Sequence, residues 1–214
     1  MEQASMSAYR AQVEKYGTPI TGGQFKELRA YANEHRIQLS GFKDYVGDIS
    51  TIKTVIDDIV EISHDFPLIL DGKKSIWLNL DYHLGSDFAK AEDHIIYLNG
   101  GYFGNLEQLE QEYDIAVKAG RFVRGTDWRA IARHETGHVV ANLYHINPMK
   151  IAMEILDTKS RIFVMEYLKQ NLSKYSVELV DGKEIISECF SAYYSKVENK
   201  FADNFLSRCR KVRL

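Results

Sequence analysis

Cysteine is scarce in this chain of 214 residues, which contains only Cys189 and Cys209. The two cysteines form no CxxC pair and have no spacing typical of metal ligands, so the sequence predicts no disulfide framework. Internal repeats, low-complexity tracts and a convincing linker are also absent. The chain is long enough for one sizeable domain, and its 45% hydrophobic and 12% aromatic residues are enough to fill a core.

The chain also lacks an excess of positive charge, a long apolar run and a secretory signal. Its 27 Lys and Arg residues face 30 Asp and Glu residues, for a net charge of −3. The basic cluster at residues 208–213 is typical of the C-terminal end of a last helix, so we expect no nucleic-acid partner. No run approaches 18 apolar residues and the first residues lack a signal pattern, so we expect no membrane span and a cytoplasmic protein.

Apolar periodicity and turn residues predict an α+β fold. We expect an N-terminal arm over residues 1–20, flexible or helical, and a single domain over residues 21–214. Two short segments rich in β-forming residues, Ile76–Leu80 and Ile95–Asn99, are predicted strands of one small mixed or antiparallel sheet. Residues 37–42 are predicted to be extended and residues 171–180 to be irregular or extended. Helices are predicted over residues 21 or 24–35, 50–64, 106–118, 126 or 127–146, 183–196 and 199–214, and over 148–168 as two helices that meet near 157–160.

The segment His134–His138 reads HETGH and matches the pattern HExxH. Two histidines four residues apart lie on one face of a helix, so both imidazoles can reach a single Zn²⁺ at roughly 2.0–2.1 Å. Glu135 follows the first histidine, which directs its carboxylate to the open side of the metal, where it can take a proton from bound water. The alternative is a helix that carries surface histidines.

The residues around this motif favour the metal site. Apolar side chains occupy almost every face of the segment, which indicates a buried helix. A buried helix would not carry two histidines and a glutamate without partners. The apolar residues are Trp128, Ile131, Ala132, Val139, Val140, Ala141 and Leu143.

A catalytic zinc with two histidines lacks one protein ligand, which must come from elsewhere in the chain. Glu184 and Glu188 are spaced i and i+4 on a predicted helix whose other faces are apolar. One of these carboxylates can bind metal while the other orients a histidine by a hydrogen bond. A solvated acidic face is the alternative interpretation. We set aside His94 as a surface residue and His145 as too distant from the metal.

At these residues the chain resembles a family, the zinc metallopeptidases related to the anthrax lethal-factor catalytic domain, which include domains of phage head proteins and mobile elements. The matching pieces are HETGH, the sequence LSKYS at Leu172–Ser176 and the sequence EIISECF at Glu184–Phe190. The resemblance covers about residues 126–194 and, more loosely, residues 50–101. It implies a zincin-like fold with an HExxH helix and a helical C-terminal part.

The resemblance also implies a role for three residues. Glu184 would be the third zinc ligand, Glu188 would support the site, and Tyr175 would donate a hydrogen bond to the oxyanion. We therefore expect a gluzincin-type zinc endopeptidase with one Zn²⁺ on His134, His138 and Glu184. Glu135 would be its general base.

The expected substrate is an extended polypeptide, bound by β-addition to the strand Ile95–Asn99. One alternative is a phage-type head or delivery component whose metal domain is chiefly structural or binding, with phage structural proteins as partners and a virion-associated location. The intact base Glu135 argues against it, because a structural zinc site has no use for a base. A third candidate is a regulatory peptidase with one intracellular target, but the DNA-binding module that would favour it is absent.

Overall fold

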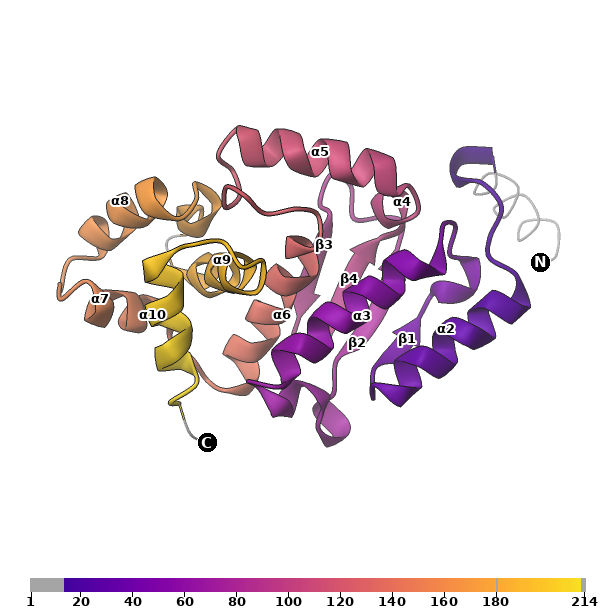
Figure 1. Cartoon of the computed structure of the whole chain (residues 1–214), viewed down its shortest axis with the longest axis horizontal. Helices are drawn as coiled ribbons and strands as arrows, with labels where there is room; N and C mark the ends of the chain where they lie inside the picture. The colour runs from indigo at the N-terminus through magenta and orange to yellow at the C-terminus, as the bar shows by residue number, and fades with distance from the viewer. Residues whose placement is uncertain (1–13, 180, 213–214) are drawn as a thin grey trace.

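The computed structural model describes residues 14–179 and 181–212. Of the expected N-terminal arm, residues 1–13 lie outside this part, and residues 14–16 are helical. The described chain has an α+β architecture, in which a small sheet lies beside a larger group of helices (Figure 1). The α+β prediction is thereby confirmed.

Four strands form one mixed sheet in the order β1-β2-β4-β3. The strands β1 (Gln38–Ser40), β2 (Trp77–Asp81) and β4 (Ile95–Asn99) are parallel, and β3 (Ala89–Glu92) is antiparallel to β4. The two predicted strands are therefore present as neighbours, and β1 lies inside the segment predicted to be extended.

The strand Ile95–Asn99 is not an edge strand, because β2 and β3 pair with its two sides. A two-residue turn at Asp93 and His94 brings β3 back along β4, with Asp93 at a φ of 56°. The expected binding of substrate to the Ile95–Asn99 strand is thus wrong. The exposed edge beside it belongs to Ala89–Glu92, whose sequence AKAE has no β-branched residue to mark it.

Side chains alternate across the central strands, and the apolar set faces the helices. Leu78, Leu80, Ile96 and Leu98 are buried, whereas Trp77 on the other face is 37% exposed. Figure 1 shows α3 (Ile49–Ser63) and α6 (Ala130–Leu143) lying side by side across the sheet. Burying each large aliphatic side chain stabilises the fold by about 1.5–3 kcal/mol.

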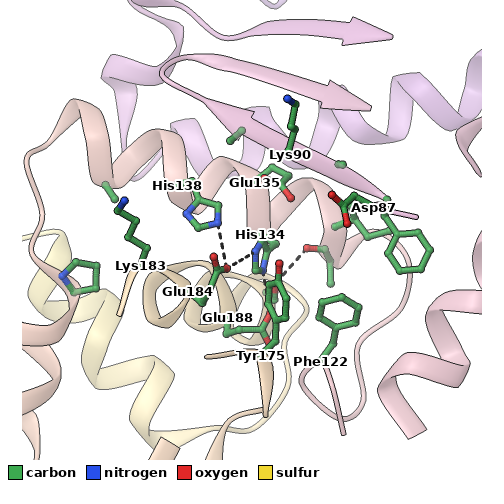
Figure 2. Close-up of a pocket in the computed structure, with 18 of the residues that line it drawn as sticks. Asp87, Lys90, Phe122, His134, Glu135, His138, Tyr175, Lys183, Glu184 and Glu188 are labelled. Atoms are coloured by element: carbon green, nitrogen blue, oxygen red, sulfur yellow. Dashed lines mark hydrogen bonds and ion pairs between the residues drawn. The ribbon is translucent and has the colours of Figure 1, made fainter. Parts of the chain in front are cut away.

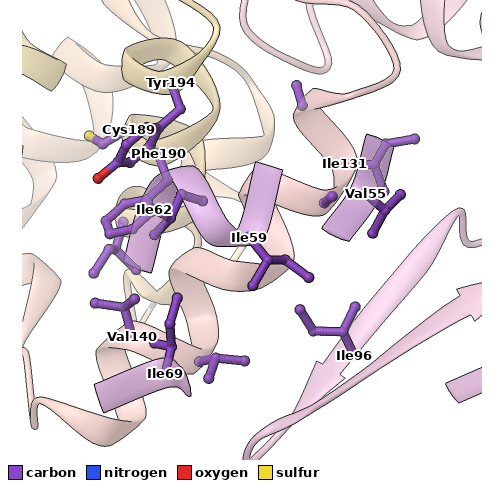
Figure 3. Packing of buried hydrophobic residues seen from close by; sticks show 14 of the residues in the cluster. Val55, Ile59, Ile62, Ile69, Ile96, Ile131, Val140, Cys189, Phe190 and Tyr194 are labelled. Atoms are coloured by element: carbon purple, nitrogen blue, oxygen red, sulfur yellow. The ribbon is translucent and has the colours of Figure 1, made fainter. Parts of the chain in front are cut away.

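The helix α3 matches the predicted helix over residues 50–64 within one residue. Its side chains Val55, Ile59 and Ile62 pack with residues of α6 and α9 (Lys183–Tyr194) in one continuous hydrophobic cluster (Figure 3). Val60 of the same helix is only half-buried. The other core positions on this helix are Ile49, Ile52 and Ile56.

Apart from α6, the remaining predicted helices lie close to their predicted ranges. Thr21 and Gln24 form the capping box that begins the first of them. Residues 172–179 of the segment predicted to be irregular or extended are irregular apart from a short 3-10 helix, η4 (Tyr175–Val177), and residue 180 lies outside the described residues. The predicted helices are present as α2 (Gly22–Glu34), α5 (Leu106–Lys118), α7 (Pro148–Ile155), α8 (Arg161–Asn171) and α10 (Lys200–Cys209). Four short helices were not predicted: η1 (Phe42–Asp44), η2 (Pro67–Leu70), η3 (Gly72–Lys74) and α4 (Gly100–Phe103).

The start of α6 differs from the prediction. Neither Thr126 nor Asp127 caps the helix, which begins at Ala130 without a side-chain cap. Thr126 Oγ1 instead donates to the Val123 carbonyl at 2.7 Å, and Asp127 accepts from the Arg129 N–H at 3.0 Å. The predicted stop at Asn147 and Pro148 is also late, because α6 ends at Leu143 and Asn147 caps α7.

A buried charge cluster holds the start of α6 against α3. The Asp58 carboxylate, fully buried on α3, accepts hydrogen bonds from Arg129 at 2.6 and 3.1 Å and from Arg133 at 2.8 and 3.2 Å. Arg133 also donates to Ser195 Oγ at 2.8 Å. Because every buried charge has a close partner, this cluster fixes the helix turn that precedes His134.

Two further findings concern the cysteines and the search for a membrane span. Cys189 and Cys209 are both buried and free. Within residues 14–179 and 181–212, no helix is long and apolar enough to cross a membrane.

Candidate metal centre

The helices α6 and α9 pack closely because Gly137 of the HETGH segment has no side chain. A Cβ atom at Gly137 would lie 2.9 Å from the Ser187 Cα and 3.3 Å from Phe190 Cβ. Backbone atoms cannot give way at that distance as the end of a flexible side chain can. The glycine therefore lets α9 approach α6 closely enough for carboxylates on α9 to reach the histidines on α6.

Three side chains converge between these helices (Figure 2). Glu184 Oε2 lies 3.1 Å from His134 Nε2 and 3.3 Å from His138 Nε2. The ligand atoms of these three residues all lie within 4.8 Å of one another, so the group can hold a metal ion. His94 and His145, which we set aside on the sequence, are not members of the group.

The Glu184 carboxylate is in an environment that suits a metal ligand. Its Oε2 atom is buried and has no hydrogen-bond partner in the described structure, although two ring nitrogens lie beside it. A buried oxygen without a partner costs free energy unless another group, such as a metal ion, satisfies it. Burial raises the pKa of Glu184, but the contacts with both histidines outweigh burial and keep it well below its usual range.

Glu188 holds the other side of the His134 ring. Its Oε1 atom lies 2.9 Å from His134 Nδ1, and its side chain is buried. When Nδ1 carries the proton and donates to Glu188, Nε2 keeps its lone pair for a metal. Without a metal, burial lowers the pKa of His134, but the contacts with Glu184 and Glu188 outweigh it and raise the pKa to about 10.

Glu135 lies on the same helix but outside the ligand group. Figure 2 shows its side chain on the side of α6 that faces the strands, whereas Glu184 and Glu188 approach from α9. Burial raises the pKa of Glu135, against the opposing effects of the charges on His134 and His138 and of a hydrogen bond from the Ala91 backbone. A raised pKa makes a carboxylate a stronger base, as proton abstraction from water requires.

Tyr175 lies in η4 beside the histidines, with its ring centroid 5.4 Å from that of His134. Its backbone N–H donates to the Arg121 carbonyl at 2.9 Å, which ties η4 to the segment after α5. Burial raises the pKa of Tyr175, and the charges on Glu184 and Glu135 raise it further. The phenol therefore stays protonated at neutral pH and can donate a hydrogen bond.

A cavity of about 620 Å³ connects these groups. It is lined by His134, Glu135, His138, Tyr175 and Glu184, so the structure brings every predicted site residue to one cavity, with Glu188 at its wall. One end of the cavity is aromatic. There the rings of Tyr113 and Phe122 stack, with their centroids 5.2 Å apart. The Phe122 ring also contacts the rings of Phe88 and Tyr175.

The edge strand β3 forms a second wall of the cavity, through Ala89, Lys90 and Ala91. The Asn99 N–H donates to the Phe88 carbonyl at 3.0 Å, so these two residues are a hydrogen-bonded pair. In an antiparallel ladder such pairs alternate with pairs that exchange no hydrogen bond, and the pairs of Ala89 with Leu98 and of Ala91 with Ile96 are of this second kind. Ala89 and Ala91 therefore direct their backbone N–H and C=O groups away from β4, to the outer edge, where the Ala91 N–H donates to the Glu135 carboxylate. This edge lies next to the HETGH helix, because β3 contacts α6.

Sequence reasoning missed β3, the aromatic wall and Arg121, all of which line the cavity. The aromatic residues come from separate loops and helices, and their spacing in the sequence forms no motif. The family resemblance named only residues from α6, η4 and α9. A search for aromatic residues between the predicted strands and the HETGH helix would have found Phe88, Tyr113 and Phe122 without indicating that they meet.

Comparisons of the chain with protein-family models, with curated proteins and with solved structures found no match.

Proposed function

We propose that the chain is a zinc-dependent endopeptidase with a zincin-like fold, as its resemblance to the lethal-factor-like metallopeptidases implies. One observation carries the proposal. The Nε2 atoms of His134 and His138 and the Oε2 atom of Glu184 meet at one point of a cavity, and a fourth residue, Glu135, lines that cavity without joining the ligands. This set combines a metal site with a base.

The distances in the group suit zinc. Tetrahedral coordination with bonds of about 2.0–2.1 Å places neighbouring ligand atoms roughly 3.3 Å apart. Glu184 Oε2 lies 3.1 and 3.3 Å from the two histidine nitrogens. Two imidazoles and one carboxylate are also a donor set that zinc favours in catalytic sites. Zinc bound there would polarise a substrate carbonyl and bring the pKa of a water molecule near 7.

The side chains around the metal position have separate tasks in this proposal. Glu135 takes the proton of the attacking water and then delivers it to the leaving amine. Tyr175 donates its phenol proton in a hydrogen bond to the carbonyl oxygen as negative charge develops there. Glu188 fixes the tautomer and direction of the His134 ring.

The substrate in this proposal is an extended polypeptide. The outer edge of β3 presents the N–H and C=O groups of Ala89 and the C=O group of Ala91, and an extended chain pairs with such an edge by main-chain hydrogen bonds. This edge takes the role that the sequence had assigned to Ile95–Asn99. A chain bound there would pass between β3 and the ligand group.

A chiefly structural or binding metal domain is the alternative function, and the ligand count speaks against it. Structural zinc sites are normally closed by four protein ligands. Within residues 14–179 and 181–212, only His134, His138 and Glu184 form a group that could hold a metal. A site with three ligands leaves a position for water and substrate.

The test is metal content together with peptide hydrolysis. Protein loaded with zinc and dialysed should retain about one ion per chain and cleave members of an extended-peptide library, and a chelator should abolish cleavage. The His134→Ala and His138→Ala variants should lose both zinc and cleavage. Full zinc retention in either variant would refute the ligand assignment, and zinc binding without cleavage of any peptide would refute the peptidase.

A further inference from the structure

Arg121 differs from the other basic side chains that line the cavity. Lys90 lies 2.8 Å from Glu92, and Lys183 lies 3.1 Å from Asp181, so both lysines have carboxylate partners. Within the part of the chain that the structure describes, Arg121 has no carboxylate within ion-pair distance. Its positive charge is therefore available to a ligand in the cavity.

The guanidinium of Arg121 is placed by aromatic rings. Its Cζ lies 5.3 Å from the ring centroid of Tyr175 and 5.7 Å from that of Phe122. A planar guanidinium against a ring face keeps the N–H donors in its plane free for a carboxylate, which they match in a bidentate geometry. Arg121 is thus oriented without its hydrogen-bonding capacity being used.

The backbone at Arg121 is also fixed relative to the metal group. Gly120, at a φ of +70°, ends the preceding helix, and the Arg121 N–H donates to the Ala116 carbonyl at 2.9 Å. The N–H groups of Lys174 and Tyr175 donate to the carbonyls of Gly120 and Arg121 at 3.0 and 2.9 Å. The Arg121 backbone therefore keeps its position beside Tyr175, whose ring is 5.4 Å from that of His134.

We propose that Arg121 is a specificity-determining residue that binds a carboxylate of the substrate close to the scissile bond. This inference rests on the proposed peptidase function. With zinc bound, the metal offsets the charge of Glu184 and Glu135 remains as a negative charge of the cavity, so a substrate carboxylate that does not reach the metal is repelled unless it meets another cation. Asp87 is a further exposed carboxylate of the lining. The preference for an acidic group should therefore be confined to the one substrate position that reaches Arg121.

The carboxylate has two sources, an Asp or Glu side chain or the C-terminus of the peptide. The probes are extended peptides of one neutral sequence with Glu or Gln placed at each position in turn, each made with a free and with an amidated C-terminus. Cleavage by the zinc-loaded full-length chain is measured as kcat/KM. Binding is measured separately with the zinc-loaded Glu135→Gln variant, so that the preference is observed even without turnover.

At one substrate position we expect kcat/KM to be about tenfold higher for Glu than for Gln. This factor lies between the effect of an exposed ion pair and that of a buried charge-assisted hydrogen bond. Arg121→Gln should remove this preference while the rate for the Gln peptide changes by less than about threefold. Arg121→Lys should retain part of the preference, because it keeps the charge but not the bidentate fork. A preference for free over amidated C-termini that is lost in Arg121→Gln would assign the carboxylate to the chain end.

The matched control is Arg124→Gln. Arg124 is an exposed arginine three residues along the same segment that does not line the cavity, so its loss should leave the Glu preference intact. An unchanged preference in Arg121→Gln would overturn the proposal, and so would an equal loss for Glu and Gln peptides, because Arg121 would then act only by holding Tyr175. If no peptide is cleaved, the proposed peptidase function fails. The Arg121-dependent binding preference then still decides whether the site receives a carboxylate.

Discussion

Substitution of Gly137 by alanine is a sharp test of how the metal group is assembled. The added Cβ would lie 2.9 Å from the Ser187 Cα and 3.3 Å from Phe190 Cβ and Cγ. Because Ser187 contributes backbone, α9 must move away from α6 as a unit. Glu184 and Glu188 lie on the same face of α9, so both carboxylates would move away from the histidines.

Two effects on stability oppose each other in this variant. Alanine gains about 0.8–1.0 kcal/mol over glycine in a helix interior. Overpacking of a close helix contact costs about 1–3 kcal/mol. We therefore expect the free energy of unfolding of the metal-free protein to fall by no more than about 2 kcal/mol, and the protein to stay folded.

Metal affinity should respond more strongly than stability. Ligand distances in metal sites hold to within about 0.2 Å, and disturbing the groups that orient ligands costs roughly 10–100-fold in affinity. The Gly137→Ala variant should thus lose at least tenfold in zinc affinity in competition with a chromophoric chelator. Urea unfolding of the metal-free protein measures the stability change separately.

The control for this substitution is Gly22→Ala in the first turn of α2. An added Cβ at Gly22 has no atom within 4 Å. This variant should have unchanged zinc affinity and equal or slightly higher stability. If Gly137→Ala binds zinc as tightly as the unmodified chain and is at least as stable, the close approach of α6 and α9 does not set the ligand geometry.

Four other predictions concern the site itself. Glu135→Gln should keep the zinc and lower kcat by roughly 10²–10⁴-fold; unchanged turnover would exclude Glu135 as the base, and loss of zinc would make it a ligand. Glu184→Ala should release most of the metal in a zinc titration, whereas Glu188→Ala should weaken affinity or activity by roughly 10–100-fold, and the reverse order would exchange their roles. Tyr175→Phe should lower kcat by about 10²–10³-fold with little change in KM; near-normal kcat would leave the ring with a packing role only. The pKa of His134 in the metal-free protein is raised to about 10, so zinc must displace a proton and its affinity should rise as pH increases from 6.5 toward 10. The stability that this protonated histidine gives the metal-free protein should be complete below pH 6.5 and be lost over the same range; a melting temperature and a zinc affinity that do not change with pH would contradict both expectations.

Local patterns were enough to predict most helices and the group at the metal position. The spacing of apolar residues predicted the helices α3 and α5. The i and i+4 spacings of the histidines and glutamates predicted which faces of α6 and α9 carry the metal group. The assignment of Glu184 and Glu188 to different tasks came from the family resemblance. The contacts of His134 agree with it, because Glu188 lies at Nδ1 and Glu184 at Nε2.

The features that were missed depend on contacts between distant residues. The strand Ala89–Glu92 exists because a turn at Asp93 folds it onto β4, and its own residues have little preference for a strand. The start of α6 was misplaced because Asp58, 71 residues before Arg129, anchors that turn in place of a cap. Arg121 was missed because one of the two rings that orient its guanidinium, Tyr175, lies 54 residues further along the chain, although the other, Phe122, is its neighbour.

The free edge of β3 has a consequence for solubility. An edge with unsatisfied N–H and C=O groups can pair with any extended chain, including the same edge of a second molecule, and this is a common route to aggregation. Short length and charged side chains are the usual protection, and β3 has both, with four residues that include Lys90 and Glu92. Replacing Lys90 and Glu92 with β-branched apolar residues would strengthen the pairing of this edge with other chains. The variant should then precipitate in a concentration-dependent way, although its metal group is unchanged.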